Sequence, residues 1–429
     1  MAAAETTPRV LMIAYHYPPF AGSSGVQRAL KFSRYLPEYG WHPVVLSVDP
    51  RAYVETRTDQ LAEIPKEVGV VRVWGFDAAR QLAIGGRYPR WLALPDRWSS
   101  WAAFAIPAAL WLARRHRVSA IWSTYPIATA HLIALAVARL TGLPWIADCR
   151  DSMTEADYPR EVAQRRVFQW LERRVVERAA RVVLTTPGTV AMYRERYPAV
   201  PPERWVDIPN GYDEDDFDHV VTAEVTARAM LKSGAFLLLH SGALYPVERN
   251  PSALFGAIGA LANAGRLTAG ELQLRLRATG HDREIRALIE RAGIGAFVEL
   301  VPGIGHRDSI REMLAADALL LLQAANCNHQ IPAKLYEYLR SGRPVLGLTD
   351  PEGDSGRALR AAGIARVVPL DDQAAIAAAL LELIAAHRAG SGSGATADAA
   401  RRFSRKAQSG DLARVLTETV AAGGRATKM

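Results

Sequence analysis

Lys334 and Glu337 lie one helical turn apart in the run NHQIPAKLYEYLRSGRPVLGL, residues 328–348. A strand predicted over 318–322 delivers the chain into this run, and Pro332 starts a short helix. Helix starts at the carboxyl edge of a parallel sheet commonly bind the charged and hydroxyl groups of nucleotides. Glu337, one turn inside the helix, can accept two hydrogen bonds from a ribose diol. An ordinary surface glutamate is the alternative.

Asp148, Arg150 and Asp151 follow a strand predicted over 144–147, so two carboxylates flank one guanidinium. At the carboxyl end of a strand, such groups can orient a sugar hydroxyl or accept its proton. A structural ion pair that closes the turn is an equally good interpretation. Thr124, at the end of the preceding predicted strand, is a second candidate for the same edge.

A loop of small residues, PPFAGSSG, follows the first predicted strand and contains Gly22, Ser24 and Gly25. Glycines let backbone N–H groups approach a bound anion, and the helix start that follows adds a favourable dipole. The loop lacks the dinucleotide-binding pattern GxGxxG. An ordinary tight turn is therefore the competing interpretation.

A second loop, after a strand predicted over 236–240, contains Gly242 and Arg249. A guanidinium in this position can clamp a diphosphate with paired hydrogen bonds and stabilise charge on a departing nucleotide. The alternative is a solvated surface arginine.

Strand-like and helix-like segments alternate through both halves of the chain. Such alternation predicts right-handed crossovers and a parallel sheet in each half, hence an α/β fold with two Rossmann-like, doubly wound domains. We expect the domains to span 1–209 and 210–390, followed by a flexible loop, a terminal helix and a tail over 391–429. Their sheet edges are expected to face a cleft, with one substrate on each side.

The chain has 429 residues, 49% of them hydrophobic, and a formal net charge of +8, so a polyanion is a plausible partner. The basic residues are scattered and no nucleic-acid-binding module is recognisable, which argues against a nucleic-acid partner. The two cysteines lack metal-type spacing, and we expect no metal site and no cofactor. With no signal-peptide pattern, a cytoplasmic protein is expected.

The longest apolar stretch, 101–113, is shorter than the roughly 20 residues that a membrane-spanning helix needs. The surrounding segment 88–117 mixes Trp, apolar and Arg residues. That mixture suits an amphipathic patch on an anionic membrane, at the inner face of the cell membrane. Ordinary packing under a loop is the alternative.

Three segments resemble family-4 glycosyltransferases: YHYPPFAGSSGVQRALKFSRYLPEYGWHPVVLS, WIADCRD and IPAKLYEY. The resemblance implies the GT-B fold and transfer of a sugar from a nucleotide-diphosphate sugar to an acceptor hydroxyl. Retention of configuration is expected, without a metal. It further suggests synthesis of bacterial cell-surface glycans or glycoconjugates, on a glycan, lipid-linked or small-molecule acceptor.

The resemblance also implies roles for individual residues. Arg249 and Lys334 would stabilise the leaving diphosphate, and Glu337 would hold the ribose. Asp148, Arg150 and Asp151 would border the acceptor. Contacts to the substrates are implied for Gly22, Ser24, Gly25, Thr124, Gly242, Gly280, Gly303, His329, Gln330, Ile331 and Pro332.

Two positions depart from the family pattern. Ala243 stands where relatives carry an arginine, and His329 stands where they carry a glutamate that contacts the donor sugar. Lys334 is our candidate for the missing cation. Two alternative functions stay open: a sugar-nucleotide epimerase of similar fold, and a non-catalytic, nucleotide-binding partner subunit at the membrane.

Overall fold

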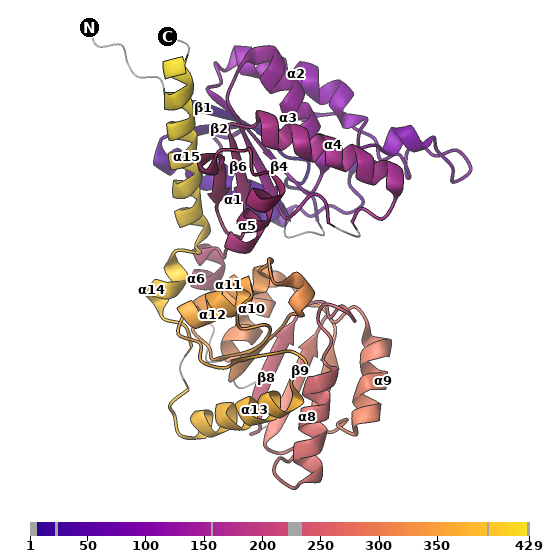
Figure 1. The fold of residues 1–429 in the computed structure, drawn as a ribbon, viewed down its shortest axis with the longest axis vertical. Coiled ribbons are helices and arrows are strands. Elements are labelled where there is room, and N and C mark those ends of the chain that lie inside the picture. Colours follow the sequence, from indigo (N-terminus) through magenta and orange to yellow (C-terminus); the bar gives the residue numbers. More distant parts are fainter. Residues whose placement is uncertain (1–6, 22–24, 156–157, 222–233, 393, 427–429) are drawn as a thin grey trace. The chain divides into compact units, whose positions relative to one another are not determined.

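The chain folds as two α/β units, each built on one parallel sheet (Figure 1). The computed structural model describes residues 7–21, 25–155, 158–221, 234–392 and 394–426. One unit comprises Met1–Pro209 together with Arg405–Met429, and the other comprises Asn210–Ser404. The predicted fold class, two doubly wound parallel sheets, is confirmed.

The sheet of the first unit has the order β3-β2-β1-β4-β5-β6-β7, and all its strand pairs are parallel. Its central strands are apolar runs buried on both faces, as expected where helices cover a parallel sheet twice. The strands are β1 (Arg9–Ile13), β2 (His42–Val48), β3 (Gly69–Val73), β4 (Ala120–Thr124), β5 (Trp145–Arg150), β6 (Arg181–Leu184) and β7 (Trp205–Asp207).

Helices cover both faces of this sheet. On one face lie α2 (Trp101–Arg115), α3 (Ala128–Thr141), α4 (Val162–Arg178) and α5 (Pro187–Arg196). On the other lie α1 (Gly25–Tyr35) and α15 (Arg405–Ala426). Short 3₁₀ turns are η1 (Leu36–Tyr39), η2 (Pro50–Ala52), η3 (Asp59–Glu63), η4 (Arg90–Ala93) and η5 (Pro202–Arg204).

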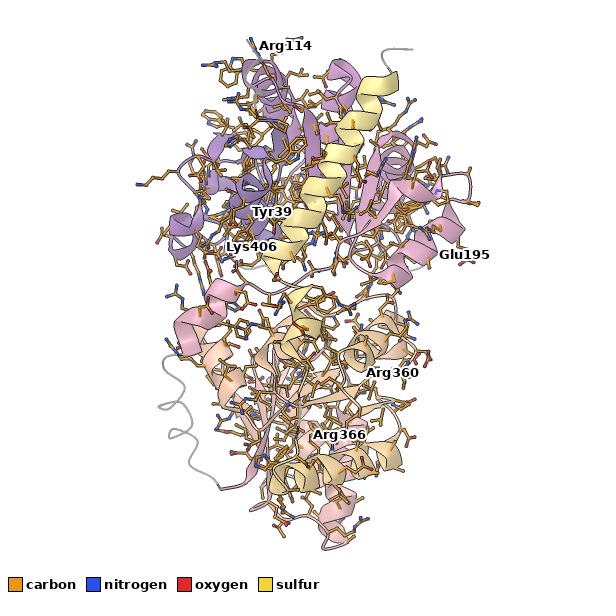
Figure 2. All side chains as sticks on the ribbon, turned by 90° about the vertical axis from the view of Figure 1, so that its left-hand side faces the viewer. Tyr39, Arg114, Glu195, Arg360, Arg366 and Lys406 are labelled. Atoms are coloured by element: carbon orange, nitrogen blue, oxygen red, sulfur yellow. The ribbon has the colours of Figure 1, made fainter. Side chains whose placement is uncertain are left out.

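The C-terminal helix α15 belongs to the first unit, whereas the sequence suggested that 391–429 forms a region of its own. Lys406 pairs with Glu38 at 2.6 Å, and the Trp41 indole donates to Thr417 at 3.0 Å. Figure 2 labels Lys406 at the start of this helix and Tyr39 beside it. Leu412, Val415 and Leu416 fill the core under it, so α15 completes the second face of the sheet.

The sheet of the second unit has the order β10-β9-β8-β11-β12-β13, again with parallel pairs only. From β8 the chain adds strands toward one edge of the sheet, β9 and β10, and from β11 it adds β12 and β13 toward the other edge. The strand order therefore reverses between the neighbours β8 and β11. The strands are β8 (Phe236–Ser241), β9 (Leu272–Arg277), β10 (Val298–Val301), β11 (Ala318–Leu322), β12 (Val345–Leu348) and β13 (Val367–Val368).

Two helical layers also cover the second sheet. One contains α8 (Ser252–Asn263), α9 (Asp282–Ala292) and α13 (Gln373–Arg388). The other contains α6 (Glu214–Val221), α10 (His306–Ala315), α11 (Ala333–Ser341), α12 (Asp354–Ala361) and α14 (Ala397–Arg401), and the 3₁₀ turn η6 (Ala325–Cys327) precedes α11. In the described part of the chain, none of the helices has the length and apolarity to cross a bilayer.

Replacing Leu416 by alanine tests the packing of α15. Leu416 is fully buried in the core below this helix. We expect Leu416→Ala to lower the free energy of unfolding by about 2–5 kcal/mol, because it removes transfer free energy and leaves a cavity. The matched control is Arg414→Ala on the exposed side of the same helix, expected to change it by less than about 0.5 kcal/mol. Urea denaturation measures both, and equal midpoints would contradict the packing.

Candidate functional site

The carboxyl ends of β8 and β11 form the switch point of the second sheet. In open α/β sheets, ligands bind outside the carboxyl ends of the strands where the strand order reverses. The loop after β8 carries Gly242 and Arg249, and the loop after β11 leads into α11 with Lys334 and Glu337. The fold therefore brings together the predicted donor-side residues from positions far apart in the sequence.

Lys334 extends from the first turn of α11 to the end of β8. Its Nζ lies 3.2 Å from Nε2 of His240. Gly242, in the left-handed region at φ 118°, provides the space, since a Cβ there would lie 2.7 Å from the lysine Nζ. Gly242 is thus part of the packing around the lysine.

His240 accepts the hydrogen bond from Lys334 as a neutral ring. Its Nδ1 lies 2.9 Å from the carbonyl oxygen of Leu320, which can only accept, so Nδ1 carries the proton. Nε2 is then the acceptor for the ammonium. Burial, followed by the nearby charge of Lys334, lowers the pKa of His240 well below its usual value, so it adds no second charge.

The charge of Lys334 is destabilised by its surroundings. Burial and, second, the positive charge of Arg249 lower its pKa to about 7, although the carboxylate of Glu337 opposes both effects. Lys334 forms no ion pair with any described residue. A bound anion would favour its charged form and restore a normal lysine pKa.

Arg249 lies in the same loop as Gly242 and is half-buried. Its Nη1 donates to the carbonyl oxygen of Ala243 at 2.9 Å, and its guanidinium lies over the Tyr245 ring, 5.1 Å from the centroid. Arg249 on the loop after β8 and Lys334 on α11 are thus close enough for the charge of Arg249 to lower the pKa of Lys334.

Glu337 is one turn beyond Lys334 on α11. Its side chain is 26% exposed, and its Oε1 lies 3.9 Å from Nε2 of His306. Next to it, the hydroxyl of Tyr338 accepts a hydrogen bond from the Ser241 backbone N–H at 3.2 Å. The Glu337 carboxylate is therefore partly screened from solvent, lies beside His306 at the start of α10, and is close enough to Lys334 to raise the pKa of that lysine.

The run from His329 to Pro332 is held by a residue that the sequence analysis did not single out, Gln323. Its amide nitrogen donates to the carbonyl oxygens of Cys327 at 2.8 Å and Gln330 at 2.9 Å. His329, Ile331 and Pro332 are half-buried, and the Gln330 side chain is exposed. Its place directly after the apolar strand β11 could have marked this glutamine as a candidate in the sequence.

Gly280 and Gly303 follow β9 and β10 at the same sheet edge. Gly280 has φ 73°, a conformation that favours glycine. At Gly303 an added Cβ would meet Ala278 at 3.6 Å, an ordinary contact, so no steric requirement for glycine is visible there.

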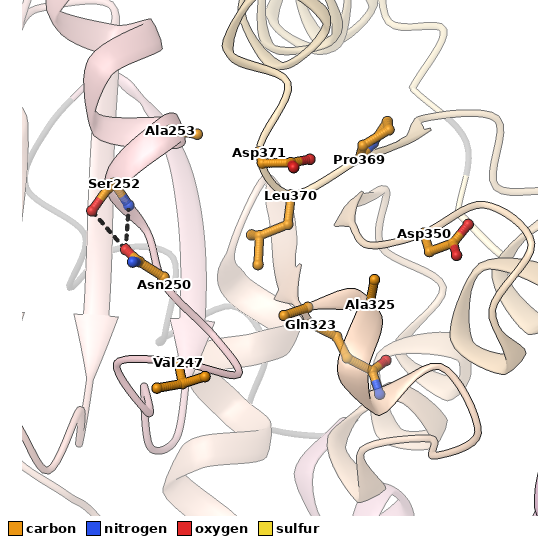
Figure 3. A pocket seen from close by; sticks show the side chains of 11 residues that line it. Val247, Asn250, Ser252, Ala253, Gln323, Ala325, Asp350, Pro369, Leu370 and Asp371 are labelled. Atoms are coloured by element: carbon orange, nitrogen blue, oxygen red, sulfur yellow. Dashed lines mark hydrogen bonds between the residues drawn. The ribbon is translucent and has the colours of Figure 1, made fainter.

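A pocket of about 430 Å³ lies on another part of this edge, between the start of α8 and the ends of β11, β12 and β13 (Figure 3). Asp350, Asp371, Asn250 and Gln323 are among its lining residues, and Asn250 accepts hydrogen bonds from Ser252. The residues that line this pocket include carboxylates and amides but no cation, and Lys334, Arg249 and Glu337 are not among them. The pocket is therefore acidic, whereas the place where Lys334 and Arg249 lie is basic.

In the first unit, Asp148 is held in a fully buried ion pair with Arg28, at 2.7 Å. The other two guanidinium nitrogens of Arg28 donate to the carbonyl oxygens of Ile208 and Pro209 at 2.9 and 2.8 Å. The ion pair considered as the alternative for Asp148 therefore forms, with Arg28 rather than Arg150. Arg28 was missed because only the tertiary fold brings α1 to β5.

The other predicted residues of the first unit lie around the same strand ends. Arg150 is buried at the end of β5, Asp151 is exposed, and the Thr124 hydroxyl donates to the Tyr125 carbonyl oxygen at 3.0 Å. Gly25 is buried at the start of α1. Gly22 and Ser24 lie outside the described residues.

Comparison with known proteins shows which folds and which family domain the chain resembles. Residues 24–211 match the family model "Glycosyl transferase 4-like domain". No curated protein sequence matches the chain.

Among solved structures, sucrose-phosphate synthase from Thermosynechococcus elongatus is 16% identical with a TM-score of 0.62, covering 98% of each chain. Anabaena HepE in complex with UDP-glucose is 14% identical with a TM-score of 0.62, covering 96% of this chain and 99% of that one. WaaG, a glycosyltransferase involved in lipopolysaccharide biosynthesis, is 17% identical with a TM-score of 0.62, covering 95% and 99%. The chain therefore shares the two-unit fold of these solved structures, and residues 24–211 are similar to the glycosyl transferase 4-like domain.

Proposed function

We propose that the chain transfers a sugar from a nucleotide-diphosphate sugar to an acceptor hydroxyl, with retention of configuration, in bacterial cell-surface glycan or glycoconjugate synthesis. The observation that carries the donor class is the meeting of Lys334, Arg249 and Glu337 at the switch point of the second sheet. Two cations suit a diphosphate and the carboxylate suits a ribose diol. WaaG's role in lipopolysaccharide biosynthesis supports the cell-surface context.

In this proposal the side chains supply the charge stabilisation without a metal or other cofactor. Arg249 and Lys334 bind the diphosphate and offset the negative charge that grows on it as the glycosidic bond to the sugar breaks. Glu337 accepts hydrogen bonds from the ribose hydroxyls and fixes the nucleotide. Since Lys334 has no carboxylate partner, binding the anion offsets the cost of keeping its ammonium among protein atoms.

The activity test is nucleotide release. UDP-glucose, which HepE binds, is the first donor to offer, followed by other nucleotide sugars. Release of the nucleoside diphosphate only when an acceptor extract is present supports transfer, and the anomeric configuration of the product reports retention. Conversion of the sugar without an acceptor would indicate an epimerase. Nucleotide binding without turnover under any acceptor would indicate a partner subunit.

Glu337→Gln and Lys334→Met should weaken nucleotide binding in different ways. Loss of a charge-assisted contact costs about 1.5–3 kcal/mol, or roughly ten- to a hundredfold in affinity. We expect Lys334→Met to weaken both UDP and pyrophosphate, and Glu337→Gln to weaken UDP alone, because pyrophosphate lacks a ribose. Calorimetry measures both ligands, with the exposed Arg286→Met of α9 as the matched control. Equal loss of UDP and pyrophosphate in Glu337→Gln would contradict the ribose role.

The lowered pKa of Lys334 predicts a pH dependence of pyrophosphate binding. Below pH 7 the lysine is an ammonium and binds the anion; above pH 7 it loses its proton, because its pKa in the free protein is about 7. The affinity should therefore fall as the pH rises through 7. Lys334→Met should flatten this step, and a step of equal size in that variant would show that another group causes it.

We further propose peripheral contact with an anionic membrane through α2, at the inner face of the cell membrane. Phe104 and Trp111 on this helix are 40% and 58% exposed, and Arg114 and Arg115 follow in its last turn. Arg114 is labelled in Figure 2. An exposed apolar stripe that ends in cations is typical of helices that lie at an anionic lipid surface.

Vesicle flotation tests this contact. We expect the chain to float with vesicles of anionic lipid and not with neutral vesicles, and Trp111→Ser to reduce flotation. Leu140→Ser, an exposed apolar residue on α3, is the matched control. Equal flotation of the two variants would contradict a role for α2.

A further inference from the structure

Arg150 is a buried guanidinium that forms no ion pair with a carboxylate of the described residues. The residue is 7% exposed, and within that part of the chain its side chain donates one hydrogen bond, from Nη1 to the Tyr125 carbonyl oxygen at 3.5 Å. Its Nε is buried and has no hydrogen-bond partner among the described residues. A buried charge without a partner is strongly unfavourable, so such a group calls for an anion.

Arg28, the other buried guanidinium at this edge, shows what full pairing looks like. All three of its nitrogens donate, to Asp148 and to two backbone carbonyl oxygens. Oδ2 of Asp148 accepts a hydrogen bond from Arg28, and its Oδ1 contacts no donor in the described chain. Asp148 therefore accepts no hydrogen bond from Arg150. Asp151 is exposed, and its charge and that of Asp148 favour the charged form of Arg150, but burial outweighs them and lowers the pKa of Arg150. No described carboxylate forms a direct ion pair with the Arg150 guanidinium.

The backbone holds Arg150 in an unusual conformation. Its φ is 59°, in the left-handed region that non-glycine residues avoid, and the register between β5 and β6 shifts between Asp148 and Arg150. The Thr185 backbone N–H and hydroxyl both donate to the Arg150 carbonyl oxygen, at 3.3 and 2.8 Å. Bulges that redirect a side chain in this way are common next to functional sites.

His16 supplies a neutral polar group at the same edge. It follows β1, which is separated from β5 only by β4 in the sheet, and its ring stacks on Phe20 at 4.2 Å. Burial and the charge of Arg150 lower the pKa of His16 to about 3, so it is uncharged at neutral pH. Its Nδ1 is also buried and has no partner in the described chain.

We propose that Arg150 binds an oxyanion, a phosphate or a carboxylate, carried by the acceptor substrate. The proposal deepens the proposed function, because it names the acceptor class that the first unit would recognise. The planar guanidinium offers paired N–H groups that match two oxygens of such an anion, and neutral His16 can add a hydrogen bond without adding charge.

Thermal unfolding with inorganic phosphate tests this inference on the full chain. All proteins carry Lys334→Met, which removes the anion contact proposed for the second unit. Relative to chloride at equal ionic strength, phosphate should raise the melting temperature of the Lys334→Met protein. It should do the same for the matched control, Lys334→Met with Arg139→Met, which changes an exposed residue on α3. With Arg150→Met added, the phosphate affinity should fall by about tenfold or more. Equal protection by phosphate would overturn the proposal.

Stability without phosphate gives a second readout. Arg150→Met should melt at the same temperature as its background or higher, because it removes an unpaired buried charge. Arg28→Met should melt much lower, because it leaves Asp148 buried without its partner. A loss in Arg150→Met as large as that in Arg28→Met would show that Arg150 is a structural group and overturn the proposal.

Two ligand series separate the sources of the anion. Glucose 6-phosphate and glucuronate report whether phosphate or carboxylate is preferred, and glucose binding as tightly as either would overturn the proposal. UDP affinity is measured with Lys334 intact, and Arg150→Met should leave it unchanged. A matching fall in UDP affinity would assign the anion to the donor and overturn the acceptor assignment. If Lys334→Met left the affinities for UDP and pyrophosphate unchanged, that result would count against the donor site only. It would not change the conclusion drawn from the Arg150 variants.

Discussion

The cost of enclosing a positive charge without a carboxylate partner is the constraint on which both candidate sites depend. Lys334 in one unit and Arg150 in the other each stand at the carboxyl edge of a parallel sheet, and neither forms an ion pair with a described residue. In both places the neighbouring histidine is kept neutral by burial. A bound anion is the group that would lower the free energy of either arrangement, which ties stability to ligand binding.

The sheets explain how these charges are held. Helices cover each sheet on both faces, so side chains that follow a strand are surrounded by protein except at the edge itself. Gly242 gives Lys334 its space, and the bulge after Asp148 directs Arg150. At the edge of the first sheet, all three guanidinium nitrogens of Arg28 donate hydrogen bonds, one of them to Asp148. Lys334 and Arg150 lack such a carboxylate among the described residues.

Much of the fold could be predicted from the sequence, because long apolar runs and turn residues mark the strands. The strand predicted over 318–322 matches β11 at both ends, and the one predicted over 236–240 matches β8 to within one residue. The strand β7 was missed, since Trp205–Asp207 is too short for a pattern. One terminal helix was predicted within 391–429, but the chain has two, α14 and α15, and only α15 belongs to the first unit.

The sites were less predictable, because their decisive contacts join distant segments. Lys334 meets His240 across 94 residues, and Arg28 meets Asp148 across 120. No local pattern indicates that a histidine inside a strand accepts a hydrogen bond from a lysine, or that an arginine on α1 neutralises a carboxylate after β5. The sequence identified Lys334, Arg249 and Glu337 as candidates by residue type and place in the chain, and the fold supplied their surroundings.

At Ala243 the chain departs from the family pattern, and cations from other positions lie close to this residue. The family resemblance implies a cation at this position, yet the Ala243 carbonyl oxygen instead accepts from Arg249, which keeps that guanidinium beside the loop. Lys334 reaches the neighbouring Gly242 from α11 and brings the second charge from another element. Two positive charges still meet at the end of β8. Since attraction for an anion depends on where the charges lie rather than on which segment carries them, this strand end keeps two cations without an arginine at position 243.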